Sequence, residues 1–394
     1  MFRGYELRCI QCGRRFEANP WTVVCSECGG LLDPVIRKKP LAISWSLFRT
    51  RKFGVWRYKE LLPPVGKPVT MGEGGTPLVE IGRNLWVKFE GANPTGSFKD
   101  RGMTVAVSLA KEYGVRNVIC ASTGNTSASV AAYASRAGMR SFVVLPKGKV
   151  ARGKLAQAIL HGATIIEVDG PFDIALEAVM RVSGRETGLY PLNSFNPWRL
   201  EGQKTLAFEV ADEIGVPDWV VLPIGNAGNI SAIWKGFREL REFGLIDKLP
   251  RLAGVQAEGA APVARAFKEE KDEPLFTERP ETVATAIRIG KPVNWPKAFR
   301  ALRESNGVVE IVSDREILEA QRALGRMGLG VEPASAASYA GYLKLLGREI
   351  GEDERVILVA TGHALKDPDV FPLVEPVRVS GTEEAVRKIR ELMA

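Results

Sequence analysis

Short apolar runs and amphipathic segments alternate along most of the chain. Residues 219–224 are mostly apolar, which is typical of a strand covered on both faces of a sheet. The segment after them repeats apolar residues at helical spacing: Ile230, Ile233, Trp234, Phe237 and Leu240. Strand and helix patterns of this kind follow one another from residue 117 to residue 256 and again from residue 315 to residue 360. This order predicts an α/β fold whose mainly parallel sheet carries helices on both faces.

The other predicted elements follow from the same two periodicities. Further strands are expected at residues 85–89, 117–121, 141–146, 164–168, 189–192, 252–256 and 355–360. Further helices are expected at residues 103–113, 127–137, 151–160, 173–182, 315–327 and 335–346, and one long helix from the segment 193–200 to about residue 214. Residues 268–310 show no pattern that assigns them.

One lysine stands between a predicted strand and a predicted helix. Turn residues precede it, and Ser97 followed by Asp100 is typical of a helix N-cap. Lys99 is therefore expected in the first turn of a helix, where the partial positive charge of the helix end disfavours an ammonium ion. This position suits a lysine that acts as a neutral amine, for example as a Schiff-base nucleophile. A surface lysine at a helix start explains the same residues equally well.

Length and composition narrow the class of protein. A chain of 394 residues favours two or three domains, and 45% hydrophobic with 25% charged residues is ordinary for a globular protein. We expect no membrane span, because no apolar run reaches about 18 residues. The N-terminus has no signal-peptide core, so a cytoplasmic protein is expected.

The net charge of +8 is distributed unevenly. The first 60 residues hold 12 lysines or arginines against 5 aspartates or glutamates, so nearly all of the excess lies there. A uniformly basic, nucleic-acid-binding surface is therefore not expected, although the N-terminal part remains a candidate for one.

Four cysteines form two knuckles near the N-terminus. Cys9 and Cys12 precede one glycine, and Cys25 and Cys28 precede another. Four thiolates in this arrangement suit a structural zinc ion, and a closed site of four ligands leaves no open position for catalysis. Iron in the same ligands and a metal-free remnant remain the alternatives.

Two loops at predicted helix starts suit anions. Residues 225–229, with the sequence GNAGN, follow a buried strand, so their N–H groups and the helix N-terminus can bind a phosphate monoester. Residues 122–126, with the sequence STGNT, can receive a carboxylate in the same way. The alternatives are a tight turn in the first loop and ordinary N-capping in the second. A lysine for an aldehyde together with a loop for a phosphate is what pyridoxal 5′-phosphate needs.

Six motifs carry a resemblance to a known family. In chain order they are NPTGSFKDRGM, STGNTSAS, NSFNPWRLEGQKT, GNAGNISA, VEPASAAS and TGHALKDP. With these motifs the chain resembles the threonine synthases, in the fold-type-II group of pyridoxal-phosphate enzymes. The resemblance implies two open, twisted, mainly parallel sheets with flanking helices, plus a small zinc-ribbon-like module. The implied domains are a module of residues 1–40, a large cofactor-binding domain of residues 41–95 and 196–394, and a small α/β domain of residues 96–195.

The resemblance also implies roles for individual residues. Lys99 matches the lysine that bonds the cofactor aldehyde. The other residues matched to cofactor binding are Asn125, Gly225, Asn226, Ala227, Gly228, Asn229 and Thr361. The residues matched to the substrate carboxylate are Ser122, Thr123, Asn125 and Thr126. The residues matched to the substrate phosphate are Asn193, Ser194 and Arg199. Ala364 is a departure, because the family usually has glycine there.

The implied reaction converts O-phospho-L-homoserine and water into L-threonine and phosphate, in a homodimer. Relatives with the same cofactor make cysteate or cysteine from O-phosphoserine, or deaminate threonine or serine, and these activities remain alternatives. A protein that binds nucleic acid through its basic four-cysteine module is the alternative from a different class; the motifs favour a small-molecule substrate without nucleic acid or membrane.

Overall fold

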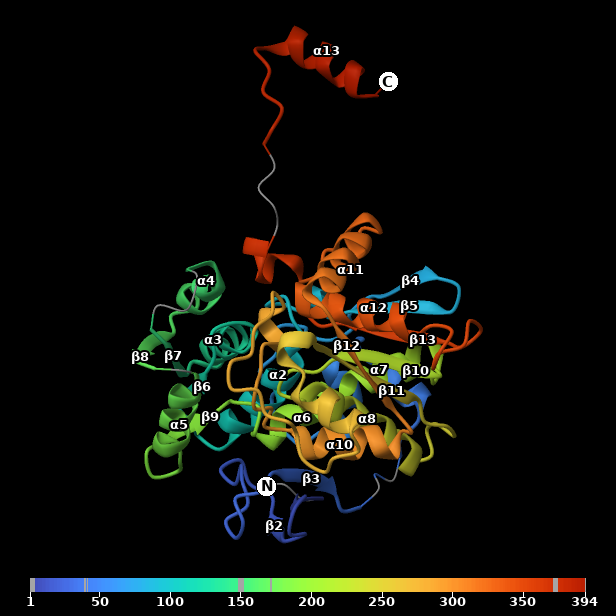
Figure 1. The fold of residues 1–394 in the computed structure, drawn as a ribbon. Coiled ribbons are helices and arrows are strands. Elements are labelled where there is room, and N and C mark those ends of the chain that lie inside the picture. The colour runs from blue at the N-terminus through green and yellow to red at the C-terminus, as the bar shows by residue number, and fades with distance from the viewer. Residues whose placement is uncertain are drawn as a thin grey trace.

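The computed structural model of the chain describes residues 4–38, 40, 42–147, 152–170, 172–370 and 375–393 (Figure 1). Leu41 and Ala151, which begin the predicted large domain and a predicted helix, lie outside these residues. The described strands form three sheets, one in an N-terminal module and two in the body of the molecule. The predicted α/β class with two mainly parallel sheets is confirmed, while the domain boundaries stay predictions.

The larger sheet lies in the centre of the body. Its strands are β4 (Leu78–Gly82), β5 (Leu85–Phe89), β10 (Trp219–Pro223), β11 (Arg251–Ala257), β12 (Val308–Val312) and β13 (Val356–Ala360). Their order is β12-β11-β10-β13-β5-β4, and every neighbouring pair is parallel except β4 with β5. The central strand β10 is buried along its whole length, as its apolar sequence predicts.

The smaller sheet lies on the left in Figure 1. Its strands are β6 (Asn117–Ala121), β7 (Arg140–Pro146), β8 (Thr164–Val168) and β9 (Leu189–Pro191), in the order β8-β7-β6-β9. All three pairs are parallel. Parallel strands need a crossover between them, and helices supply it.

The helices of the body follow the strands in sequence. They are α1 (Trp45–Arg49), α2 (Lys99–Glu112), α3 (Asn125–Ala137), α4 (Arg152–Leu160), α5 (Phe172–Val182), α6 (Pro197–Gln203), α7 (Thr205–Ile214), α8 (Gly228–Glu242), α9 (Pro262–Lys268), α10 (Trp295–Glu304), α11 (Asp314–Arg326) and α12 (Pro333–Leu345). A last helix, α13 (Thr382–Met393), stands apart from the body at the top of Figure 1.

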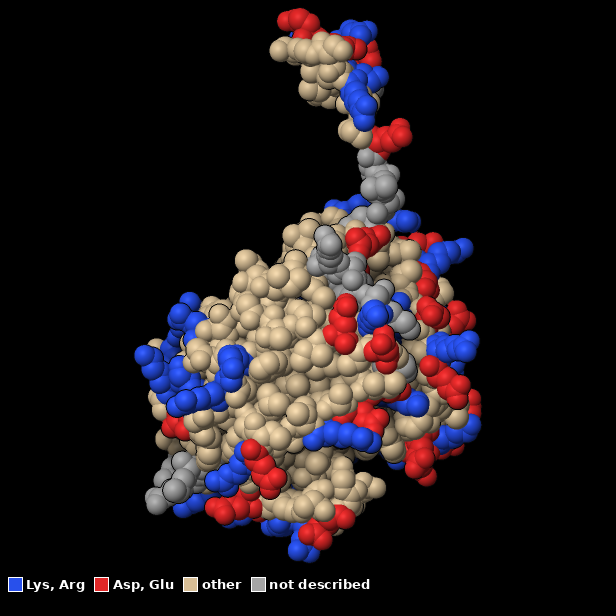
Figure 2. All heavy atoms as spheres, turned by 90° about the vertical axis from the view of Figure 1, so that its left-hand side faces the viewer, with Lys and Arg blue, Asp and Glu red and all other residues tan. Residues whose placement is uncertain are grey.

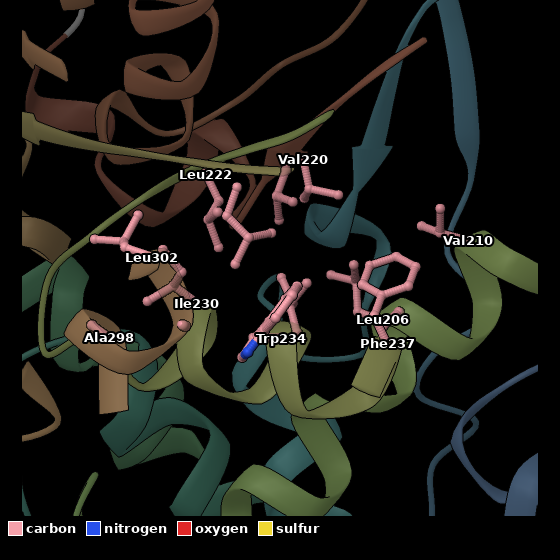
Figure 3. Packing of buried hydrophobic residues seen from close by; sticks show 14 of the residues in the cluster. Leu206, Val210, Val220, Leu222, Ile230, Trp234, Phe237, Ala298 and Leu302 are labelled. Carbon is pink, nitrogen blue, oxygen red and sulfur yellow. The ribbon is translucent and has the colours of Figure 1, made fainter. Parts of the chain in front are cut away.

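The largest apolar core lies between the larger sheet and three of these helices. Figure 3 shows side chains from α7, α8 and α10 beneath β10. The labelled members are Leu206, Val210, Val220, Leu222, Ile230, Trp234, Phe237, Ala298 and Leu302. Their burial stabilises the helix that follows the GNAGN loop, so the loop is attached to a rigid element.

The N-terminal module packs under the body, at the bottom of Figure 1. Its strands β1 (Tyr5–Cys9), β2 (Arg15–Glu17) and β3 (Leu32–Ile36) form an antiparallel sheet in the order β2-β1-β3. The Tyr5 hydroxyl donates to the Leu61 carbonyl (3.0 Å), and both residues are buried. The module is therefore joined to the body by buried contacts.

The predicted capping pair at the start of α2 is wrong. Phe98 occupies the N-cap position, and the Ser97 hydroxyl has no hydrogen-bond partner among the described residues. The Asp100 carboxylate instead accepts from the Thr95 N–H and hydroxyl (2.7 and 2.6 Å) and from the Ser129 hydroxyl (2.6 Å). A long-range hydrogen bond to α3 thus replaces the local cap.

Two other helical predictions needed tertiary information. The single helix expected up to residue 214 is divided into α6 and α7 at Lys204. The unassigned residues 268–310 contain α10 and the start of β12. Pro296 stands in the first turn of α10, where proline is tolerated, so this helix has a local signal that the periodicity did not reveal.

Helices α2 and α6 pack closely because each has a glycine at the point of contact. A Cβ built at Gly202 would lie 1.7 Å from the Arg101 carbonyl oxygen, and one at Gly102 would lie 2.7 Å from the Arg199 carbonyl oxygen. Any side chain at Gly202 would force the helices apart. This contact sets Lys99 on α2 close to Arg199 on α6.

The surface combines charged areas with an uncharged face. Figure 2 shows acidic and basic side chains around a broad face that has few of either. Large apolar residues are exposed on α4 and α5, namely Ile159, Leu160, Ile174 and Met180. Among the described helices, none is long and apolar enough to cross a membrane.

Candidate active site

One cavity collects most of the predicted site residues. It lies beyond the carboxyl ends of β10 and β13, the usual ligand position in an open parallel sheet. The predicted residues that line it are Lys99, Asn125, Ser194, Arg199, Gly225, Asn226, Ala227, Gly228, Asn229 and Thr361. We call this space the Lys99 cavity.

The backbone on both sides of Lys99 fixes the lysine at the cavity. Lys99 is the first residue of α2, as predicted. The turn before it pairs with the loop after β13: the Phe98 N–H donates to the Thr361 carbonyl (3.0 Å), and the His363 N–H donates to the Gly96 carbonyl (2.9 Å). Residues more than 260 positions apart are therefore held side by side.

The surroundings of Lys99 favour its neutral amine. Burial lowers the pKa of Lys99 to about 7, and the nearby Arg199 charge adds to this, while Glu332 acts in the opposite direction. The amine lies over the Phe98 ring, 4.3 Å from its centroid. A substantial share of the neutral, nucleophilic form is then present near neutral pH.

The GNAGN loop turns sharply into α8. Ala227 has a left-handed backbone with φ +61°, which is uncommon for a residue with a side chain and is found at functional sites. A Cβ at Gly225 would lie 3.1 Å from the Ala286 carbonyl oxygen, so glycine relieves a close approach. The first N–H groups of α8 have no partners within the helix and are available to an anion at the cavity.

Four buried polar atoms at the cavity lack partners. They are Arg199 Nε, Gln203 Oε1 and both amide atoms of Asn229, and none has a hydrogen-bond partner among the described residues. Most buried polar groups in proteins are hydrogen-bonded, so several exceptions around one cavity indicate a polar ligand there. These residues come from α6 and α8, which meet at the cavity.

Arg199 is almost fully buried. Its Nη1 donates to the Leu192 carbonyl (3.0 Å), and burial lowers its pKa to about 10. No carboxylate pairs with it in the described part of the chain. A buried guanidinium without a counter-ion is costly, so an anionic ligand would stabilise it.

Glu332 is a residue that the sequence analysis missed. Its carboxylate accepts from Asn125 Nδ2 at both oxygens (3.0 Å each), and Thr361 Oγ1 lies 3.4 Å away. Burial raises the pKa of Glu332. Gln203 was missed as well. The motifs VEPASAAS and NSFNPWRLEGQKT contain both residues, but neither pattern shows that they face Lys99.

The remaining predicted residues do not line the Lys99 cavity. Ser122, Thr123 and Thr126 are partly exposed in the STGNT loop, next to Asn125. The Asn193 amide bonds to the N–H and carbonyl of Ala121 (2.9 Å each). That pair joins the STGNT loop to the segment that carries Ser194.

The four cysteines of the module come together as predicted. Their sulfurs lie within 4.8 Å of one another, with Cys9 3.5 Å from Cys28 and Cys12 3.7 Å from Cys25. Cys9 and Cys25 are buried, and Cys12 and Cys28 are exposed. The group could hold a metal ion of tetrahedral preference.

Comparisons with known proteins agree with this geometry. The profile of the family described as "Pyridoxal-phosphate dependent enzyme" matches residues 69–362. The chain is 50% identical to threonine synthase of Methanosarcina acetivorans, over 98% of either chain. It is 51% identical to threonine synthase of Methanocaldococcus jannaschii, over 97% of this chain and 98% of that one.

Solved structures show the same fold. Threonine synthase from Escherichia coli superimposes with a TM-score of 0.73 at 19% identity, covering 92% of this chain and 90% of that one. The chain therefore belongs to the family of pyridoxal-phosphate-dependent enzymes and, within it, to the threonine synthases.

Proposed function

We propose that this enzyme converts O-phospho-L-homoserine and water into L-threonine and phosphate at the Lys99 cavity. The observation that carries the proposal is the buried Arg199, which has an unpartnered Nε beside a lysine of lowered pKa. A guanidinium can meet a phosphate with two parallel hydrogen bonds. A phosphorylated amino acid supplies both the anion for Arg199 and the amino group that would take the place of Lys99 on the cofactor aldehyde.

Pyridoxal 5′-phosphate is assigned to the residues named from the sequence. Lys99 would bond its aldehyde, Asn125 its phenolic oxygen, residues 225–229 its phosphate, and Thr361 would face its ring nitrogen. The unpartnered amide of Asn229 and the free N–H groups of α8 fit a phosphate. When bound, the cofactor withdraws electrons and so makes the substrate Cα–H acidic.

Lys99 acts as the base of the reaction. Once the substrate amino group has taken its place on the aldehyde, the neutral amine removes the proton at Cα and then one at Cβ. Phosphate leaves from Cγ, and Cγ then takes up a proton to become the methyl group. Water adds its hydroxyl at Cβ, and a proton returns to Cα, so the atoms of phosphohomoserine and water appear as threonine and phosphate. The Thr361 hydroxyl is a weaker partner for a ring nitrogen than a carboxylic acid would be.

The substrate is held at its two charged ends. Ser122, Thr123, Asn125 and Thr126 receive the carboxylate at the start of α3. Arg199 and Ser194 bind the substrate phosphate. Asn193 contributes by holding Ser194, because both of its amide atoms already bond to Ala121.

Mass analysis of the products tests the reaction. The purified holoenzyme is incubated with phosphohomoserine, and separately with phosphoserine, with and without sulfite or sulfide. We expect threonine and phosphate from the first substrate. Cysteate or cysteine from phosphoserine, without threonine from phosphohomoserine, would contradict the proposal. Threonine and serine alone serve as controls for a deaminase.

We also propose a structural zinc ion at Cys9, Cys12, Cys25 and Cys28. Two buried and two exposed sulfurs within 4.8 Å of one another support it. Metal analysis of the purified protein is expected to give one zinc per chain. One iron per chain, or no metal after purification without chelators, would contradict it.

A homodimer is the proposed assembly. The uncharged face in Figure 2 and the exposed apolar residues Ile159, Leu160, Ile174 and Met180 support a protein contact. Light scattering on the eluting protein is expected to give twice the mass of one chain; the mass of a single chain would contradict it. A cytoplasmic location stays a prediction.

A further inference from the structure

Helix α6 has two functional faces. One face carries Arg199 and Gln203, which line the Lys99 cavity. The other carries Trp198 and Glu201, which are buried against the N-terminal module and α8. The four-cysteine module therefore rests on the helix that supplies the arginine.

A hydrogen bond joins the module directly to α6. The Trp198 indole N–H donates to the Asn19 carbonyl (3.2 Å), and the Trp198 ring lies 6.2 Å from the ring of Tyr5. Asn19 lies in the loop between the two cysteine knuckles. Trp198 is fully buried and precedes Arg199 in the sequence.

A partly buried lysine joins the same two elements through charge. Lys235 on α8 bonds to Asp33 of β3 (3.1 Å) and to the Pro34 carbonyl, and it lies 2.5 Å from Glu201 of α6. Glu201 also accepts from Lys204 (2.6 Å). One ammonium group thus holds the module and α6 at a fixed separation.

Asp33 is the module's counter-charge in this cluster. Lys297 and Arg300 of α10 lie 3.8 and 3.9 Å from its carboxylate. Burial would raise the pKa of Asp33, but Lys235, then Lys297 and Arg300 outweigh it and hold the pKa below its usual range. Removal of this carboxylate takes away the counter-ion that these three cations share; Lys235 then keeps Glu201, and Arg300 keeps Glu304 (3.3 Å).

We propose that the four-cysteine module is a positioning element of the active site, which holds α6 so that Arg199 and Gln203 face the substrate phosphate. Asp33 and Trp198 are the positioning residues. Neither touches the cavity, so they act through α6. The inference rests on the proposed role of Arg199. It gives a function to the four-cysteine module, which takes no direct part in the proposed reaction.

The test measures the binding of inorganic phosphate to the holoenzyme. We expect Asp33→Asn and Trp198→Phe each to weaken phosphate binding by about 3- to 10-fold and to raise KM for phosphohomoserine similarly. Visible absorbance of the cofactor and its occupancy should stay unchanged, which separates a displaced α6 from general damage. Trp198→Phe keeps an aromatic ring, so it serves if Asp33→Asn fails to fold.

Matched variants distinguish the possible results. Asp353→Asn removes an exposed ion pair with Arg83 far from the module and should leave phosphate binding unchanged. Arg199→Ala tests the proposed function: if it leaves phosphate binding intact, the arginine is not the phosphate ligand. If Arg199→Ala abolishes binding while Asp33→Asn and Trp198→Phe both bind phosphate like the parent, the positioning role is overturned.

A double-variant cycle tests the charge link itself. Asp33→Asn and Glu201→Gln remove the two carboxylates that Lys235 joins. If Lys235 links the module to α6, breaking the link at both ends should do no more harm than breaking it at one. The double variant should then bind phosphate as tightly as whichever single variant has the lower affinity. Multiplicative losses would mean that the two carboxylates act independently, and would overturn the link through Lys235.

Discussion

Two cations lie two residues apart at the start of α2 and have opposite surroundings. Arg101 is fully buried and bonds to Glu90 and Glu209 at 2.6–2.8 Å, and also to Thr76 and Thr205. Lys99 faces a cavity where the nearest strong influences are Arg199 and Glu332. Burial acts on both, yet the carboxylates around Arg101 raise its pKa, while the pKa of Lys99 falls to about 7.

The contrast separates a structural cation, Arg101, from Lys99, the cation that we propose to react. Arg101 joins α2 to the segment just after β5 and to α7 through partners that use all three of its nitrogens, so nothing is left for a ligand. Around Lys99 the protein leaves polar atoms unpaired and an amine that can lose its proton. A buried charge with complete pairing indicates stability, and incomplete pairing indicates a site.

The largest expected effect is that of Lys99→Ala. Without the amine, turnover should fall by at least about 10³-fold, because both the bond to the cofactor and the base are lost. The visible absorbance of the bound cofactor should disappear, while the unfolding temperature of the cofactor-free protein changes little. Phosphate-release assays and absorbance spectra check this. Turnover close to that of the parent enzyme would remove Lys99 from the reaction.

Arg101→Met should affect stability instead of chemistry. It leaves Glu90 buried without a cation and Glu209 with Lys88 alone (3.1 Å), which costs about 3–5 kcal/mol of unfolding free energy. The control is Arg83→Met, in an ion pair whose side chains are 84% and 85% exposed, where about 0–1 kcal/mol is expected. Urea unfolding measures both. Equal losses of unfolding free energy in the two variants would mean that Arg101 is no more important for stability than an exposed arginine.

Arg199→Ala should raise KM for phosphohomoserine by about 10- to 100-fold, because a charged hydrogen bond to phosphate is lost. Weak binding of homoserine, which has no phosphate, should change far less. Steady-state kinetics give KM for phosphohomoserine, and competition by homoserine gives its binding constant. An equal change for both ligands would make Arg199 a structural residue like Arg101.

The smallest expected effect is on pH dependence. Between pH 6 and pH 8 the neutral fraction of Lys99 should rise from about one-tenth to about nine-tenths, since its pKa is lowered to about 7. The rate at which the cofactor-free enzyme binds pyridoxal phosphate should therefore rise with pH and level off above pH 8. In Arg199→Ala the midpoint should move to higher pH, because a repelling charge is absent. A rate that is flat over this range would contradict the lowered pKa.

Local patterns predicted much of the fold. The apolar run of β10, the helical spacing in α8 and the turn before Lys99 each depend on neighbours in the sequence, and their elements form where the pattern indicates. The cysteine knuckles are local as well, and their four sulfurs meet. The motifs were informative because a loop between a strand and a helix has few possible geometries.

Long-range contacts escaped prediction for a physical reason. Asp100 was paired with Ser97 because the two are close in sequence, but Thr95 and Ser129 offer it better hydrogen bonds. Glu332 and Gln203 reach the cavity only once α12 and α6 are packed, and no spacing in the sequence records that packing.

By itself the sequence determined the alternation of strands and helices, the lysine at a helix start, the two polar loops at helix starts and the four thiols, since each depends on residues within a few positions of one another. Only the tertiary structure decided which side chains face Lys99, how far its pKa falls, and that the cysteine module rests on α6. Those properties depend on burial and charge from segments far apart in the sequence, such as Lys99 and Glu332, which are 233 residues apart and meet only in the folded chain.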